Sequence, residues 1–271
     1  MSENSLLYER PGPVGLLKNR VYAVAGGAFV LILLWSVIFR LYQRGQFDHD
    51  RWSVFLNTQV WGFLLNGLYA TLLVAAISGA LSFACSVPLA LARISENHLI
   101  RKTAEVYISA FRAVPLLLLI LFMAVLLPTV GFAWPAMAFL VVALTLHHSA
   151  LLAEIVRSGI MSLERGQREA AVSIGMTGGQ SMYYIVLPQA IRTMMPALIG
   201  QLLAIVQDTS LGYIIPYNEL LRCSQLISTY APQSLLQAAF VSTLLYGMIS
   251  ALLMVVQYKV KTRNRAVANM A

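Results

Sequence analysis

Long apolar runs separated by short polar stretches dominate the chain from about residue 20 onward. A helix needs about 20 apolar residues to cross the hydrocarbon core of a bilayer. We predict six membrane-spanning helices: 21–41, 64–92, a third that starts within 103–112 and ends at 127, 136–155, 193–215 and 235–258. Helices satisfy their own backbone hydrogen bonds in lipid, so the pattern predicts an all-α polytopic membrane protein.

The first run belongs to an N-terminal extension, residues 1–60, which also holds a polar, aromatic segment typical of the membrane interface. The run exceeds the roughly 7–15 apolar residues of a signal peptide. No small-x-small cleavage pattern follows it. We therefore expect it to be retained as a membrane anchor.

Composition and charge agree with a membrane protein. Hydrophobic residues make up 59% and charged residues 11% of the 271 positions, against about 25% charged residues in soluble domains. Six spans place both termini on one side, and 15 of the 19 lysines and arginines fall on that side, including the basic tail 259–271. This bias predicts cytoplasmic termini. It also explains the net charge of +8 without a nucleic-acid partner.

The stretch 156–192 is long and less hydrophobic than its neighbours. We predict a short helix over 169–174 that ends at a C-cap glycine, Gly175. A glycine pair at 178–179 predicts a turn, and a second short amphipathic helix then leads to Pro188. Two short helices joined by glycines would form a rigid protrusion suited to a groove on a soluble partner. An ordinary loop is the alternative, although loops of 30 or more residues are uncommon.

The same stretch resembles the signature loop of ABC importer permeases, in which Glu-Ala-Ala, three residues, Gly, nine residues and Ile-x-Leu-Pro follow one another. The positions that match are Glu169, Ala170, Ala171, Gly175, Ile185, Leu187 and Pro188. The resemblance implies that residues of about 160–190 form the loop that couples the permease to its ATPase.

Further segments are similar to permeases of the polar amino-acid branch, and the long N-terminus resembles glutamate-uptake permeases. These segments are 66–72, 92–95, 107–117, 153–160 and 208–211. The sequence departs from that branch at Ala113-Val114, where Gly-Thr is common, and at Gln207, where Lys is common. The resemblance implies a type I importer core of five helices over 64–258, with one helix added before it.

The resemblance also implies partners and a location. These are an ATPase dimer at the cytoplasmic loops, a second permease subunit (identical or different) and an extracytoplasmic binding protein that delivers glutamate, glutamine or aspartate. The expected location is the bacterial cytoplasmic membrane. The sequence has no Gly-x-x-x-x-Gly-Lys-Ser/Thr loop. We therefore expect ATP and magnesium on the separate ATPase chain, with no cofactor and no enzymatic activity in this one.

Asp208 is the one acid inside a predicted span away from its ends. An aspartate at the centre of a membrane helix costs about 2.5–3.5 kcal/mol on the insertion scale, so this carboxylate lines a cavity or has a partner. Two roles stay open. It meets the ammonium group of a transported amino acid, or it forms a structural tie with Thr209 and Ser210 near a helix break.

Gln201 lies about two helical turns before Asp208, so both side chains could face one lumen. His147 and His148 lie in the fourth span, where one could donate to a substrate carboxylate, although hydrogen bonds between helices are the commoner role of such residues. No metal-ligand spacing surrounds them. Glu154 and Arg157 have the spacing of a helix-surface ion pair.

Two other classes of protein remain as alternatives. A secondary transporter or channel subunit would commonly show inverted repeats and several discontinuous helices, and no repeat is evident. An intramembrane protease would need a nucleophile with its base, or a set of metal ligands, and the two histidines stand in no such motif.

Overall fold

The computed structural model describes residues 13–163 and 165–268, with the backbone alone at 13, 14, 16, 165, 166, 168, 169 and 263–268. The described residues are helical or irregular and include no strand. The chain divides into two compact units, residues 1–56 and 57–271. The boundary lies close to the end of the predicted N-terminal extension.

The first unit consists of one long helix and a short folded segment. Helix α1 spans Pro13–Gln43, and α2 (His49–Trp52) and η2 (Ser53–Leu56) follow it. Apolar side chains of α1 such as Trp35 and Phe29 are exposed, as suits a helix that lipid surrounds. The indole of Trp52 donates to the carbonyl of Gln46 at 3.1 Å, which closes the turn between α1 and α2.

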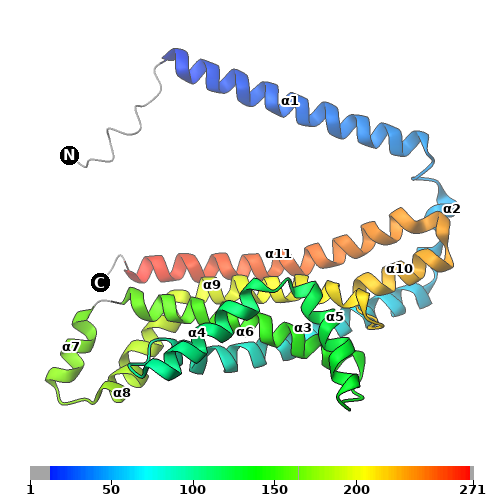
Figure 1. Ribbon diagram of the computed structural model, residues 1–271. Coiled ribbons are helices and arrows are strands. Elements are labelled where there is room, and N and C mark those ends of the chain that lie inside the picture. Colours follow the sequence, from blue (N-terminus) through cyan, green and yellow to red (C-terminus); the bar gives the residue numbers. More distant parts are fainter. Residues whose placement is uncertain (1–12, 164, 269–271) are drawn as a thin grey trace. The chain divides into compact units, whose positions relative to one another are not determined.

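The second unit is a helical bundle (Figure 1). Its elements are α3 (Thr58–Arg93), α4 (His98–Ala113), α5 (Leu116–Thr129), α6 (Ala136–Ser162), α7 (Arg165–Ser173), α8 (Gly178–Ser181), the π-helical turn η3 (Met182–Val186), α9 (Leu187–Asp208), η4 (Thr209–Ile214), α10 (Leu220–Tyr230), η5 (Pro232–Ser234) and α11 (Leu235–Ala268).

Five helices of the described part are long and apolar enough to span a membrane, and a sixth is counted when α4 and α5 are taken as one span. The prediction of six spans in an all-α protein is therefore confirmed. The third span is broken, however, because α4 and α5 meet at 103°. Pro115 lies at the break, and a proline disfavours helical backbone at the residue before it, Val114.

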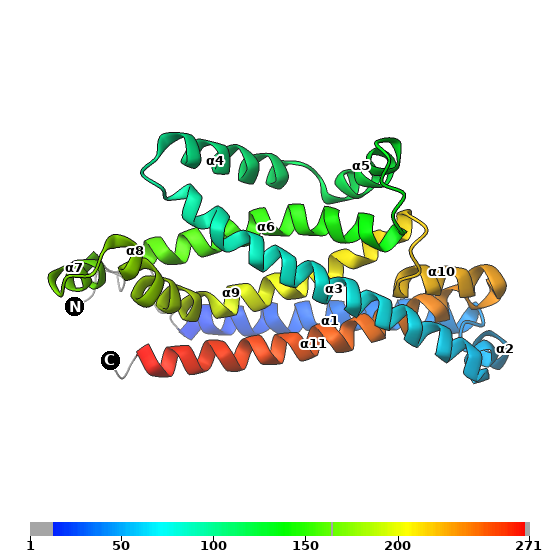
Figure 2. The same cartoon turned by 90° about the horizontal axis from the view of Figure 1, so that it is seen from below.

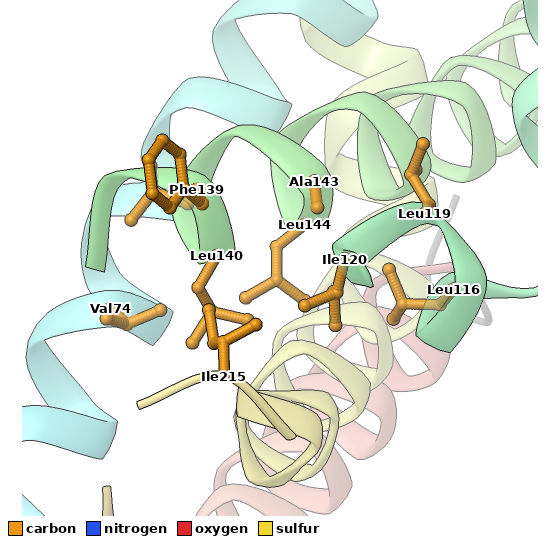
Figure 3. Packing of buried hydrophobic residues seen from close by; sticks show 10 residues of the cluster. Val74, Leu116, Leu119, Ile120, Phe139, Leu140, Ala143, Leu144 and Ile215 are labelled. Atoms are coloured by element: carbon orange, nitrogen blue, oxygen red, sulfur yellow. The ribbon is translucent and has the colours of Figure 1, made fainter. Parts of the chain in front are cut away.

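Helix α6 is the centre of the bundle. Near its start, Phe139, Leu140 and Leu144 pack against Val74 of α3, Ile215, and a group from α5 that includes Leu116 and Ile120 (Figure 3). Near its end, Val156 and Ile160 pack in a second cluster with Ala190 and Leu198 of α9. The central helix therefore holds α3, α5 and α9 in fixed positions around it.

The two ends of this bundle carry different structures. Helices α7 and α8 lie together at one end, and α10 lies at the other, beside the start of α3 (Figures 1 and 2). Helices α9 and α11 run alongside one another between these ends (Figure 2).

Candidate functional site

The predicted coupling loop forms a defined protrusion. Helix α7 ends at a Schellman motif, in which the N–H of Met176 donates to Ala171 O at 3.1 Å and that of Gly175 donates to Val172 O at 2.9 Å. Gly175 has φ +85°, a conformation that side-chain-bearing residues rarely adopt. The predicted C-cap glycine is confirmed.

The second half of the protrusion differs from the sequence-based expectation. Gly178 and Gly179 do not form a turn but begin α8, because Thr177 and Gln180 form a capping box before them. The helix also does not stop at Pro188. Pro188 lies in the first turn of α9, directly after the π-helical turn. A residue without a backbone N–H is tolerated at that position.

The residues of the signature loop occupy distinct environments. Ala171 and the intervening Val186 are buried, Ile185 and Leu187 are half-buried, and Ala170 and Pro188 are exposed. Glu169 belongs to α7, but its side chain lies outside the described part of the chain. The motif therefore contributes both to the packing of the protrusion and to its surface.

The surface of the protrusion is unusually apolar for a polar loop. Val172, Ile174, Tyr183 and Tyr184 are each at least 60% exposed. The two tyrosine rings contact edge to face with centroids 5.1 Å apart. Exposed apolar side chains on a rigid element are typical of a protein-binding surface.

A second group of polar residues lies inside the bundle, at the far end of α9. Asp208 Oδ2 lies 3.2 Å from Nε2 of His148, and Gln201 Nε2 lies 2.7 Å from Nδ1 of the same ring. His148 is fully buried, whereas the side chain of Asp208 is 35% exposed. The carboxylate therefore has a buried partner on one side and remains accessible on the other.

The remaining substrate-path candidates do not join this cluster. His147 turns away, with Nδ1 2.9 Å from the carbonyl oxygen of Phe111. Thr209 and Ser210 donate at 2.7 Å to the carbonyls of Val206 and Gln207, which are contacts within their own chain segment. Thr209 and Ser210 thus bond to the backbone, as the structural-tie alternative expects. Asp208 instead contacts another helix.

The structure distinguishes the two histidines and adds one residue that the sequence analysis did not name. His148, rather than His147, meets Asp208, and the two positions are 60 residues apart, so a single sequence gives no signal for the pair. Glu219 is fully buried at the start of α10. Its place before an apolar helical stretch could have suggested a cap, but not the contact it makes with α11.

Glu154 and Arg157 form the predicted ion pair on α6, at 2.5 Å. No group of three or more potential metal ligands occurs among the described residues. The two candidate sites are thus a protein-binding protrusion at one end of the bundle and a polar cluster near the other. One helical stretch, 178–214, connects them.

This fold is that of a multi-pass membrane protein. The chain belongs to the family of binding-protein-dependent transport system inner membrane components, whose model matches residues 84–266. The sequence-based resemblance to ABC importer permeases is thereby confirmed.

Individual relatives agree with this family. The chain is 38% identical over 230 residues to the glutamate transport system permease protein GluD of Corynebacterium glutamicum, covering 82% of this chain and 83% of the relative. It is 38% identical over 166 residues to the probable glutamine ABC transporter permease protein GlnP of Bacillus subtilis, covering 61% and 76%. A solved amino acid ABC transporter with histidines matches with a TM-score of 0.70 and 27% identity, over 76% of this chain and 96% of that one.

Proposed function

We propose that this chain forms the translocation path of an ATP-driven importer for polar amino acids, with glutamate the first expectation and glutamine or aspartate the next. The names of the similar permeases support this substrate class, since they include glutamate and glutamine systems. A partly exposed carboxylate inside the bundle suits a substrate that carries an ammonium group.

The proposed coupling site is the protrusion of α7, α8 and η3. Two ATPase subunits would dock there and on the corresponding loop of a second permease, identical or different. The exposed apolar side chains and the rigid glycine-terminated turn support this assignment. ATP and magnesium would be held by the ATPase chains, since this sequence has no phosphate-binding loop.

The proposed orientation places both termini in the cytoplasm of a bacterium. The distribution of lysine and arginine supports it. The protrusion then faces the ATPase, and α10, at the opposite end of the bundle (Figure 1), faces an extracytoplasmic binding protein. Each permease would open alternately to the two sides as the ATPase dimer closes and opens.

The observation that carries the proposal is the continuous helical stretch Gly178–Ile214. It begins in the protrusion and contains Asp208 near its other end. A movement of the protrusion would therefore pass along one continuous helical stretch to the carboxylate. His148, whose Nδ1 lies 2.7 Å from Gln201 Nε2, approaches that carboxylate to 3.2 Å, and the accessible side of Asp208 can receive the substrate ammonium.

Replacement of Asp208 by asparagine tests the substrate assignment, because it keeps the size and deletes the charge. In the assembled transporter reconstituted in vesicles, we expect Asp208→Asn to lower glutamate uptake at least tenfold, about 1.4 kcal/mol. ATP hydrolysis stimulated by the loaded binding protein is expected to change as well. Asp50→Asn, at an exposed position of the first unit, is the matched control and should behave like wild type. A normally assembled Asp208→Asn transporter with wild-type uptake would contradict the assignment.

A further inference from the structure

Glu219 is a fully buried carboxylate outside the polar cluster described above. It is the N-cap of α10, where Oε1 accepts from the backbone N–H of Arg222 at 2.6 Å and Oε2 from that of Leu221 at 2.7 Å. Oε2 also accepts from the hydroxyl of Tyr246 on α11, at 2.8 Å. One side chain thus joins two helices that are consecutive in sequence and packed together.

The contacts of Tyr246 extend this junction to two more elements. Its hydroxyl also lies near the side chains of Thr71 on α3 and Thr209 on η4. Thr71 in turn accepts from the backbone N–H of Leu220 at 3.2 Å. Four elements, α3, η4, α10 and α11, therefore meet around one carboxylate, and Thr209 is the residue that directly follows Asp208.

The choice of residue indicates a role beyond capping. Short side chains such as Ser, Asp and Asn are preferred at N-caps, because they reach the free backbone N–H groups with few rotatable bonds. A glutamate there bears a larger ordering cost and a burial cost, and burial raises the pKa of Glu219 above its usual value. Glutamate has one methylene group more than aspartate, and this added length allows its carboxylate to reach Tyr246.

The position of the junction gives it a functional meaning. Helix α10 lies at the end of the bundle opposite the protrusion (Figures 1 and 2), the end that the proposed orientation turns toward the binding protein. The chain of contacts runs from the start of α10 through Glu219 and Tyr246 to Thr209. It therefore leads from an outer helix to the residue beside the carboxylate of the proposed substrate path.

We propose that Glu219 is a positioning residue which, through Tyr246 and Thr209, couples the position of α10 to that of Asp208. This inference rests on the proposed function, since it assigns to α10 the task of reporting the docked binding protein to the substrate path. Loss of the Glu219–Tyr246 contact leaves both the cap and Asp208 in place but disconnects them.

Two conservative variants separate coupling from capping. Glu219→Asp keeps a carboxylate that caps α10 well but withdraws it by one methylene from Tyr246. Tyr246→Phe removes the hydroxyl and leaves the cap intact. Tyr69→Phe, which removes the hydroxyl of an exposed tyrosine on α3, is the matched control.

The measurements use the complete transporter in vesicles, with ATPase subunits, second permease and binding protein. We expect Glu219→Asp and Tyr246→Phe to assemble and to keep ATP hydrolysis in the absence of binding protein. Stimulation of hydrolysis by the loaded binding protein and uptake of glutamate should each fall at least fivefold. The double variant should be no worse than the stronger single variant, because both remove one contact. Tyr69→Phe should match wild type.

Wild-type stimulation and uptake in both variants would overturn the inference and leave Glu219 a helix cap. If Glu219→Asp fails to assemble, Tyr246→Phe decides alone, with the same two outcomes. The failure of the proposed function looks different, because the wild-type complex itself would then show no ATP-dependent uptake of glutamate.

Discussion

Gly67 should be required for the close approach of α3 to α10. A Cβ atom added at this position would lie 2.7 Å from Sγ of Cys223 and 3.1 Å from Cα of Leu220, whereas ordinary contact begins at 3.4 Å. The helices would have to separate by several tenths of an ångström, and the backbone of Leu220 cannot move aside as a flexible side chain could. Overpacking of this kind costs about 1–3 kcal/mol.

The assay is the fraction of assembled complex that survives heating in detergent, followed by size-exclusion chromatography. Gly67→Ala should lower the midpoint relative to wild type. Cys223→Ala in the same chain should recover part of the loss, because it removes the nearest atom but leaves the contact with Leu220. Gly62→Ala is the matched control on α3, where an added Cβ meets nothing within 4 Å. Equal stability of Gly67→Ala and wild type would refute the reasoning.

Three further predictions concern other parts of the chain. Gly175→Val should lower folding stability by about 1–2 kcal/mol, because valine disfavours the left-handed backbone at this position, and it should lower uptake by the assembled transporter. Gly175→Asn should have a milder effect, because asparagine tolerates that backbone. Equal uptake by the two variants would contradict this prediction. Gln201→Leu should remove a hydrogen-bond partner of buried His148 and lower folding stability by about 1–3 kcal/mol. Thermal unfolding measures this loss, and an unchanged midpoint would show that the contact is dispensable. A chain that lacks residues 1–60 should still insert with Lys261 inside, and modification of Lys261 by an impermeant reagent from outside would contradict that orientation.

The spans could be predicted from the sequence because lipid imposes a minimum length of apolar residues. Their ends could not be predicted as well, because a helix continues for as long as its backbone is capped, not only where it is apolar. Asn57 caps α3 by accepting from Gln59 N at 2.9 Å, so this helix begins six residues before its predicted start. Helix α6 likewise continues to Ser162, beyond its apolar run.

The local features of the protrusion divide in the same way. The role of Gly175 depends on its immediate neighbours and was predicted correctly. The glycines at 178–179 were misinterpreted, because the capping box of Thr177 and Gln180 outweighs their preference for turns. The helix break at Pro115 follows from the restriction that proline places on the residue before it. The apolar pattern continues across the break, so the pattern alone predicted one uninterrupted span.

Contacts between distant residues could not be predicted from one chain. Asp208 could be singled out because a charge inside a span needs a partner, but the identity of that partner, His148, depends on how α6 packs against α9. The same holds for Glu219 and Tyr246, which meet only because α10 folds back along α11. Charge inside a span is thus visible in the sequence, and the network that satisfies it is not.

The most direct test of the account is glutamate uptake by the complete transporter in sealed vesicles, with ion gradients clamped and ATP supplied or withheld on the side of the ATPase. We expect uptake to require both ATP and the loaded binding protein, and to be lost in Asp208→Asn while the complex remains assembled. Uptake that persists without ATP and follows an ion gradient would identify a secondary transporter and contradict the account.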